Sequence, residues 1–100
     1  MIRIRYIVND VDKAVEFYTS NLDFRLKQQF GPAIAILERD GVQLLVSGPM
    51  ASASRPLPDG SKPSPGGWNR FQIVVDDIES VVSRLRQNGV LFKNDIIENQ

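Results

Sequence analysis

Residues 6–18, with the sequence YIVNDVDKAVEFY, decide the fold predicted for this chain, because they join the end of a β-strand to the start of a helix. Between residues 2 and 8, apolar and polar side chains alternate with the period of a strand that has one strongly apolar face. Asp10 is a good helix N-cap, and Asp12 adds negative charge to the first turn, where the helix dipole favours it. The apolar residues that follow recur at helical spacing: Val11, Ala14, Val15, Tyr18 and Leu22. We therefore predict a strand followed by an amphipathic helix that ends near residue 21.

Three further strands are predicted after this helix, over residues 24–30, 33–39 and 42–47. Gly31 and Pro32 form a turn between the first two of them. Asp40 and Gly41 separate the last two and are the strongest hairpin signal in the chain. The predicted order of elements is β-α-β-β-β.

The opening pattern returns 67 positions later. Five residues of the first copy are identical to their counterparts at this offset: Arg3, Val8, Asp10, Val15 and Asn21. A strand from residue 70 and a helix capped by Asp77 and stopped by Gly89 are therefore predicted. The counterpart of the strand at 42–46 would be residues 109–113, beyond residue 100. We expect a duplicated module whose second copy is incomplete.

Residues 48–67 separate the two copies. They hold five of the six prolines and four of the seven glycines, with almost no apolar periodicity. This composition predicts a loop, and its length is typical of a linker or a lid.

Charge and composition exclude several classes of protein. Twelve basic residues balance twelve acidic ones, so the excess positive charge of a nucleic-acid or membrane binder is missing. The chain has no Cys and no His, which excludes disulfides, thiolate metal sites and imidazole-based triads. Arg3, Arg5 and Asn9 interrupt anything like a signal peptide, and no window approaches the ~18 apolar residues of a membrane span. We expect a cytoplasmic, soluble domain.

Residues 6–18, followed by LDF at 22–24, resemble the opening of a vicinal oxygen chelate domain. That superfamily includes glyoxalase I, extradiol dioxygenases, and the bleomycin and fosfomycin resistance proteins. Residues 71–78, FQIVVDDI, resemble the start of its second module. Asp23 stands where the family usually has glycine, a mild departure because Asp tolerates a left-handed backbone.

The resemblance implies an α+β fold in which paired β-α-β-β-β modules form a curved mixed sheet around a cavity. We expect residues 1–100 to make one such domain. Module one spans residues 1–47, the loop spans 48–67, and a partial module two spans 68–100.

The resemblance also implies where metal-using members hold their ion. Each module gives a ligand from its first strand, commonly His, and can give a carboxylate from its fourth. The matching positions here are Arg3, Arg70 and, within about a residue, Gln43. A guanidinium repels a divalent cation and cannot deprotonate to bind it. We therefore predict no metal, no other cofactor and no assigned catalytic residue.

Arginines at these positions suit an anion instead. Strand alternation places Arg3 with Arg5, and Arg70 with Gln72, on the faces that the resemblance implies line the cavity. The guanidinium fork binds carboxylates, phosphates and phosphonates. The predicted ligand-binding residues are Arg3, Arg5, Gln43, Trp68, Arg70 and Gln72. The alternative is that Arg3 and Arg70 pair with acids such as Glu38 or Asp95 near solvent, and that Trp68 packs in a core or interface.

Three functions stay open at this point. The leading hypothesis is a small-molecule-binding protein of the resistance or sequestration type, without metal and as a homodimer. The second is a lyase or dioxygenase whose metal ligands lie elsewhere or beyond residue 100. The third is a dimerising structural module without chemistry.

Overall fold

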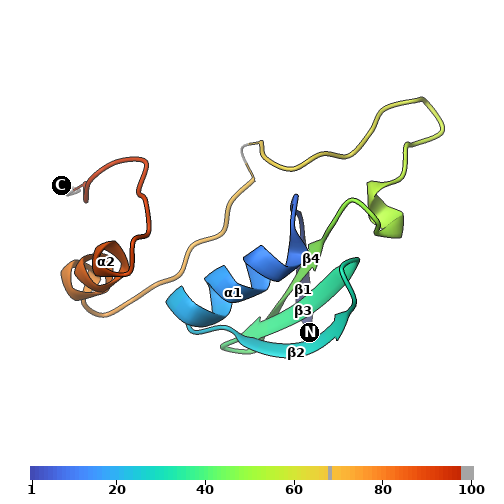
Figure 1. The fold of residues 1–100 in the computed structure, drawn as a ribbon. Helices are drawn as coiled ribbons and strands as arrows, with labels where there is room; N and C mark the ends of the chain where they lie inside the picture. Colours follow the sequence, from blue (N-terminus) through green and yellow to red (C-terminus); the bar gives the residue numbers. More distant parts are fainter. Residues whose placement is uncertain (68, 98–100) are drawn as a thin grey trace. The chain divides into compact units, whose positions relative to one another are not determined.

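The computed structural model describes residues 1–67 and 69–97, and it divides into two compact units, Met1–Asn69 and Arg70–Gln100. The first unit contains most of the regular structure (Figure 1). Its elements are β1 (Ile2–Ile7), α1 (Val11–Asn21), β2 (Arg25–Phe30), β3 (Ile34–Arg39), β4 (Val42–Ser47) and a short 3-10 helix, η1 (Ser52–Ser54). This order is the predicted β-α-β-β-β.

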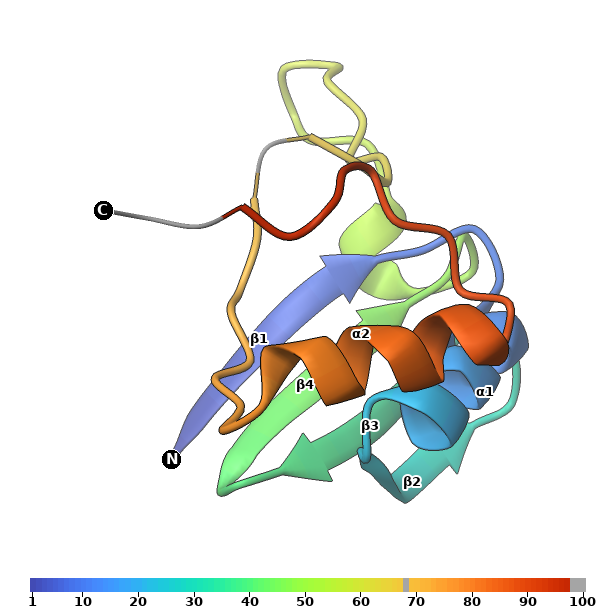
Figure 2. The same cartoon turned by 90° about the vertical axis from the view of Figure 1, so that its left-hand side faces the viewer.

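The four strands form one mixed sheet in the order β1-β4-β3-β2 (Figures 1 and 2). β1 runs parallel to β4, whereas β4 and β3, and β3 and β2, are antiparallel. The predicted α+β class with a mixed sheet is confirmed, and each strand in this unit lies within about two residues of its predicted bounds. The first and fourth strands of the module therefore lie side by side, which brings Arg3 opposite Gln43.

The core of the first unit lies between α1 and one face of the sheet. The side chains that point toward the helix are fully buried at Ala35, Leu37, Leu44 and Val46. Val11 at the start of α1 is 2% exposed, so it closes this core at one end. Gly48 lies against it, and a Cβ there would come within 2.9 Å of a Val11 methyl group, which explains the glycine after β4.

Side-chain and backbone contacts at both ends of α1 stabilise the helix. The Asp10 carboxylate accepts a hydrogen bond from the Lys13 backbone N–H at 3.0 Å, as expected of an N-cap. Asp23, just after the helix, has φ +57°, which confirms the left-handed backbone inferred at this position. Arg39 of β3 reaches the end of the helix, where its Nη1 donates to the Leu22 carbonyl at 2.8 Å.

The second unit contains α2 (Ile78–Gln87), capped by Asp77, which accepts from the Ser80 N–H at 3.1 Å. Gly89 follows it with φ +83°, so both predicted ends of this helix are confirmed. The strand predicted from residue 70 is not formed, because residues 69–76 carry no strand pairing. A strand needs a paired neighbour, as β1 has in β4, and among the described residues no strand ladder includes residues 69–76.

Residues 48–67, in the later part of the first unit, are irregular apart from η1, as predicted, but they are folded locally. The Ser54 hydroxyl donates to the Gly48 carbonyl at 2.8 Å and holds η1 against the end of β4. A turn follows, in which the Leu57 N–H donates to the Ser61 carbonyl at 2.7 Å. Among the residues that the structure describes, no helix is long and apolar enough to cross a membrane.

Candidate functional site

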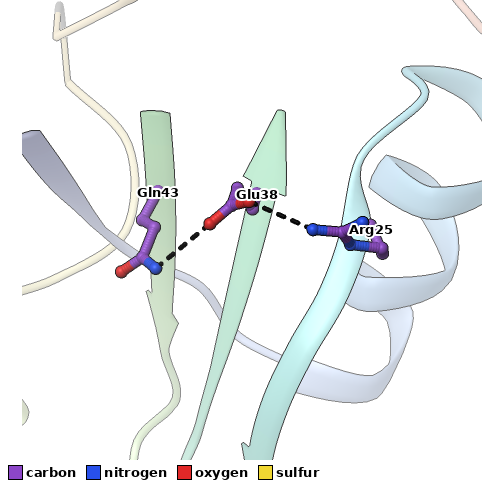
Figure 3. A network of polar contacts seen from close by, with 3 residues as sticks. All are labelled: Arg25, Glu38 and Gln43. Atoms are coloured by element: carbon purple, nitrogen blue, oxygen red, sulfur yellow. Dashed lines mark hydrogen bonds and ion pairs between the residues drawn. The ribbon is translucent and has the colours of Figure 1, made fainter. Parts of the chain in front are cut away.

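A row of four polar side chains crosses all four strands on the face of the sheet that points away from α1, called the open face below. The strand register places Arg3 of β1 beside Gln43 of β4, Gln43 beside Glu38 of β3, and Glu38 beside Arg25 of β2. Figure 3 shows Gln43, Glu38 and Arg25 reaching one another across neighbouring strands. The sheet itself therefore assembles this row, called the polar row.

Hydrogen bonds run along the whole polar row. The Nε and Nη2 groups of Arg3 donate to Oε1 of Gln43 at 3.0 and 2.8 Å. The Gln43 amide nitrogen donates to Oε2 of Glu38 at 3.3 Å, and Arg25 Nη2 donates to the other Glu38 oxygen at 3.1 Å. Gln43 is only 7% exposed, so its amide is fixed with the oxygen toward Arg3 and the nitrogen toward Glu38. This buried amide orients the Arg3 guanidinium.

Charge is unevenly balanced along the polar row. Glu38 forms an ion pair with Arg25. Arg3 contacts a neutral amide, and no ion pair joins it to an acid within residues 1–67 and 69–97. Arg5, two residues further along the same face, also lacks an ion pair or side-chain hydrogen bond in that part of the chain. The open face thus has an excess of positive charge on β1.

The open face becomes apolar toward the far end of β1. The next row contains Arg5, Leu45, Ile36 and Gln28, and the third contains Ile7, Ser47, Ile34 and Phe30. A register irregularity between Leu26 and Gln28 returns Gln28 and Phe30 to the open face. Ser47 is fully buried in the third row, and its hydroxyl has no hydrogen-bond partner among the described residues.

Two cavities lie beside β1, where the segment after β4 runs close to that strand. One has a volume of about 240 Å³, and its lining residues are Arg5, Tyr6, Ile7, Ser64, Gly66, Gly67 and Asn69. The other has a volume of about 320 Å³ and is lined by Ile7, Val8 and Asn9, three prolines, Lys62 and two serines. The cavities share Ile7 and Ser64, so they adjoin.

A family model described as the Glyoxalase/Bleomycin resistance protein/Dioxygenase superfamily matches residues 1–97. The chain belongs to this superfamily. Its membership confirms the resemblance that the strand-helix stretch at residues 6–18 indicated. No curated protein matches the chain.

Solved structures agree with the superfamily fold. The lactoylglutathione lyase from Agrobacterium tumefaciens is similar with a TM-score of 0.70 and 16% identity, over 94% of this chain and 73% of that protein. The protein SMU.1112c is similar with a TM-score of 0.57 and 23% identity, over 89% of this chain and 74% of that one. At these identities the likeness concerns the fold.

Arg3 and Gln43, at two positions where the resemblance implies metal ligands, do not fit a divalent cation. Arg3 brings a permanent positive charge, and the one oxygen that Gln43 offers already accepts two hydrogen bonds from it. Within the described ranges, no three or more Asp or Glu side chains gather closely enough to hold a metal ion.

Arg3 and Gln43, two of the six predicted ligand-binding residues, are in direct contact. Arg5 lies on the same face, in the next row. Arg70 and Gln72 are exposed residues of the second unit, and Trp68 lies outside the described residues, so their part in a shared cup stays a prediction.

The acids named as alternative partners bind other arginines: Glu38 binds Arg25, and Asp95 binds Arg86 at 2.7 Å. The position of Glu38 beside Gln43 could have been predicted from the sequence. The two-residue turn at Asp40-Gly41 sets the hairpin register and places Glu38 opposite Gln43.

Proposed function

We propose that this superfamily member binds a small anionic molecule on the open face of its sheet, without a metal, and that Arg3 and Gln43 are the anchors. The observation that carries the proposal is the Arg3–Gln43 contact. A guanidinium without an acid partner is held in place by a buried amide, at two positions where the superfamily resemblance implies metal ligands.

The fixed orientation of Arg3 supports this proposal. A long exposed side chain loses rotamer entropy when it binds a ligand, and that loss opposes binding. Here two N–H groups are already committed to Gln43, so the guanidinium plane is set before any ligand arrives. The remaining N–H groups can form charge-assisted hydrogen bonds with a carboxylate, phosphate or phosphonate.

Arg5 is the second anchor in this proposal, since it is about 7 Å further along the same strand face. Arg70 and Gln72 are included in the proposal because they are the counterparts of Arg3 and Arg5 in the second copy of the repeat. Trp68 is included as an aromatic wall of the site. Substituting each of these three residues by Ala tests its part separately.

Titration calorimetry with inorganic phosphate, acetate and methylphosphonate tests the proposal. We expect at least one of these anions to bind the wild-type protein and to bind Arg3→Gln about tenfold more weakly, because a charge-assisted contact is lost. Arg55→Gln is the matched control: Arg55 is exposed and lines neither cavity, so binding should not change.

A second measurement separates anion binding from metal chemistry. Protein purified without chelator is analysed for bound metal, and its thermal unfolding is followed with added Ni²⁺, Zn²⁺, Mn²⁺ and Fe²⁺. Stoichiometric metal with a large rise in Tm would overturn the proposal in favour of a metal-dependent lyase or dioxygenase. Equal anion binding by wild type and Arg3→Gln would show that Arg3 is not the anchor.

A further inference from the structure

We infer that the ligand is an anion with an apolar body, and that it lies along the outer edge of β1 with its charged group at Arg5 and its body in the adjoining proline-lined cavity. The inference rests on the proposed function in one respect, since Arg5 is an anchor in both. The ligand class and the position of the body are new.

The smaller cavity has the donors that an anionic group needs. Arg5 lines it, together with Ser64 and Asn69, and nothing in the described part of the chain pairs with the Arg5 guanidinium. Gly66 and Gly67 also line it and have φ near +96° and +98°, so this wall is backbone without side chains. An anion can therefore approach Arg5 closely.

The edge of β1 adds backbone donors to the same cavity. The Val8 N–H donates to the Ser47 carbonyl at 2.8 Å, which fixes the phase of the parallel ladder. In such a ladder alternate residues direct both backbone groups to the neighbouring strand. The N–H groups of Arg5 and Ile7 therefore point to the outer edge, where both residues line the cavity. The Arg5 side chain and these N–H groups form a site for a carboxylate or phosphate.

The larger cavity suits an apolar body. Ile7 and Val8 line one side, and Pro49, Pro63 and Pro65 line the other. Its volume of about 320 Å³ is at the lower end of the ~300–1,000 Å³ of small-molecule pockets. Because the two cavities share Ile7 and Ser64, one molecule can place a charged group in the smaller and an apolar chain in the larger.

The wall of the larger cavity is held in position before binding. The Ser54 hydroxyl anchors η1 to Gly48 at 2.8 Å, next to Pro49. The proline rings fix φ, so this segment has less backbone freedom to lose when a ligand binds. The apolar site therefore needs little ordering.

Titration calorimetry with acetate, butanoate, hexanoate and octanoate tests this inference, with hexanamide as the uncharged match for hexanoate. We expect the affinity to rise about three- to fourfold for each methylene buried, until the cavity is full. Hexanamide should bind at least about tenfold more weakly than hexanoate. Arg5→Gln should weaken every carboxylate by about tenfold and keep the dependence on chain length.

Val8→Thr keeps the shape of the side chain but replaces a methyl group with a hydroxyl at the lining of the larger cavity, so it should reduce the dependence on chain length and leave acetate binding unchanged. Arg55→Gln is again the control. If phosphate binds through Arg3 but octanoate binds no better than acetate, the inference alone is overturned. If neither phosphate nor any carboxylate binds, the proposed function falls with it. Octanoate binding that Arg5→Gln leaves unchanged would show that the charged group lies elsewhere.

Discussion

Arg3 and Gln43 lie side by side on parallel strands, and two N–H groups of the Arg3 guanidinium donate to the same amide oxygen of Gln43, at 3.0 and 2.8 Å. In metal-using relatives, as the resemblance implies, the matching strands hold an ion. The fold thus brings the same two positions together here. Arg3 at the first of them favours an anion, whereas a metal ligand favours a cation.

Gln43→Glu should weaken anion binding. A carboxylate at this position would pair with Arg3 and neutralise the positive charge that the neutral amide leaves in place. We expect the affinity for inorganic phosphate to fall by about tenfold in titration calorimetry. Unchanged affinity would indicate that the Arg3 charge takes no part in binding.

Glu38→Gln should have the opposite effect. It removes the only acid of the polar row while keeping its shape, so the positive potential on the open face increases. Across two strands in water this change is worth about 0.5 kcal/mol, or about a twofold gain in phosphate affinity. The partner, Arg25, is 72% exposed, so the lost ion pair should lower the free energy of unfolding by less than about 1 kcal/mol. Weaker phosphate binding by this variant would contradict the electrostatic argument.

Ser47→Ala should stabilise the protein. The Ser47 hydroxyl is buried and has no partner among the described residues, and a buried polar group without a hydrogen bond costs about 1–3 kcal/mol. We expect the free energy of unfolding in urea to rise by about 1 kcal/mol. Ser54→Ala is the matched control, because Ser54 is also buried but its hydroxyl donates to the Gly48 carbonyl, and the loss of this bond should destabilise the fold by about 1 kcal/mol.

Substitutions of Asp23 should follow the backbone conformation. With φ +57°, Asp23 occupies the left-handed region that β-branched residues avoid. Asp23→Val should lower the free energy of unfolding by about 1–2 kcal/mol, and Asp23→Gly should leave it nearly unchanged. Urea unfolding of the two variants checks this, and equal stabilities would show that the turn after α1 relaxes.

Acidification should unravel the start of α2. The Ser80 hydroxyl and N–H bind the Asp77 carboxylate and hold its pKa below the ordinary value of 3.8. A lowered pKa means that the cap contributes stability above the ordinary pKa and loses it as the pH falls through the folded value. Far-ultraviolet circular dichroism should show helix content falling at acidic pH. Asp77→Asn keeps a capping side chain without this titration, so its helix content should depend less on pH.

The α-helices and the hairpin turn could be predicted because their signals are local. Asp10 and Asp77 cap helices through backbone groups three residues away, and the Asp40-Gly41 turn pairs strands that adjoin in the sequence. The pairing of Glu38 with Gln43 across β3 and β4 also follows from that turn. Alternation along β1 correctly placed Arg3 and Arg5 on the face opposite the core.

The Arg3–Gln43 contact depends on pairing between strands 40 residues apart, and the cavities beside β1 depend on where the segment after β4 returns to that strand. No local pattern sets either one. The strand predicted from residue 70 shows the same limit. Its alternation matches that of β1, yet no strand ladder among the described residues includes it. The α-helices, the hairpin turn and the superfamily could thus be read from local patterns of residues. Which side chains meet depends on the folded unit, because strand partners are selected by burial and hydrogen bonding over the whole of it.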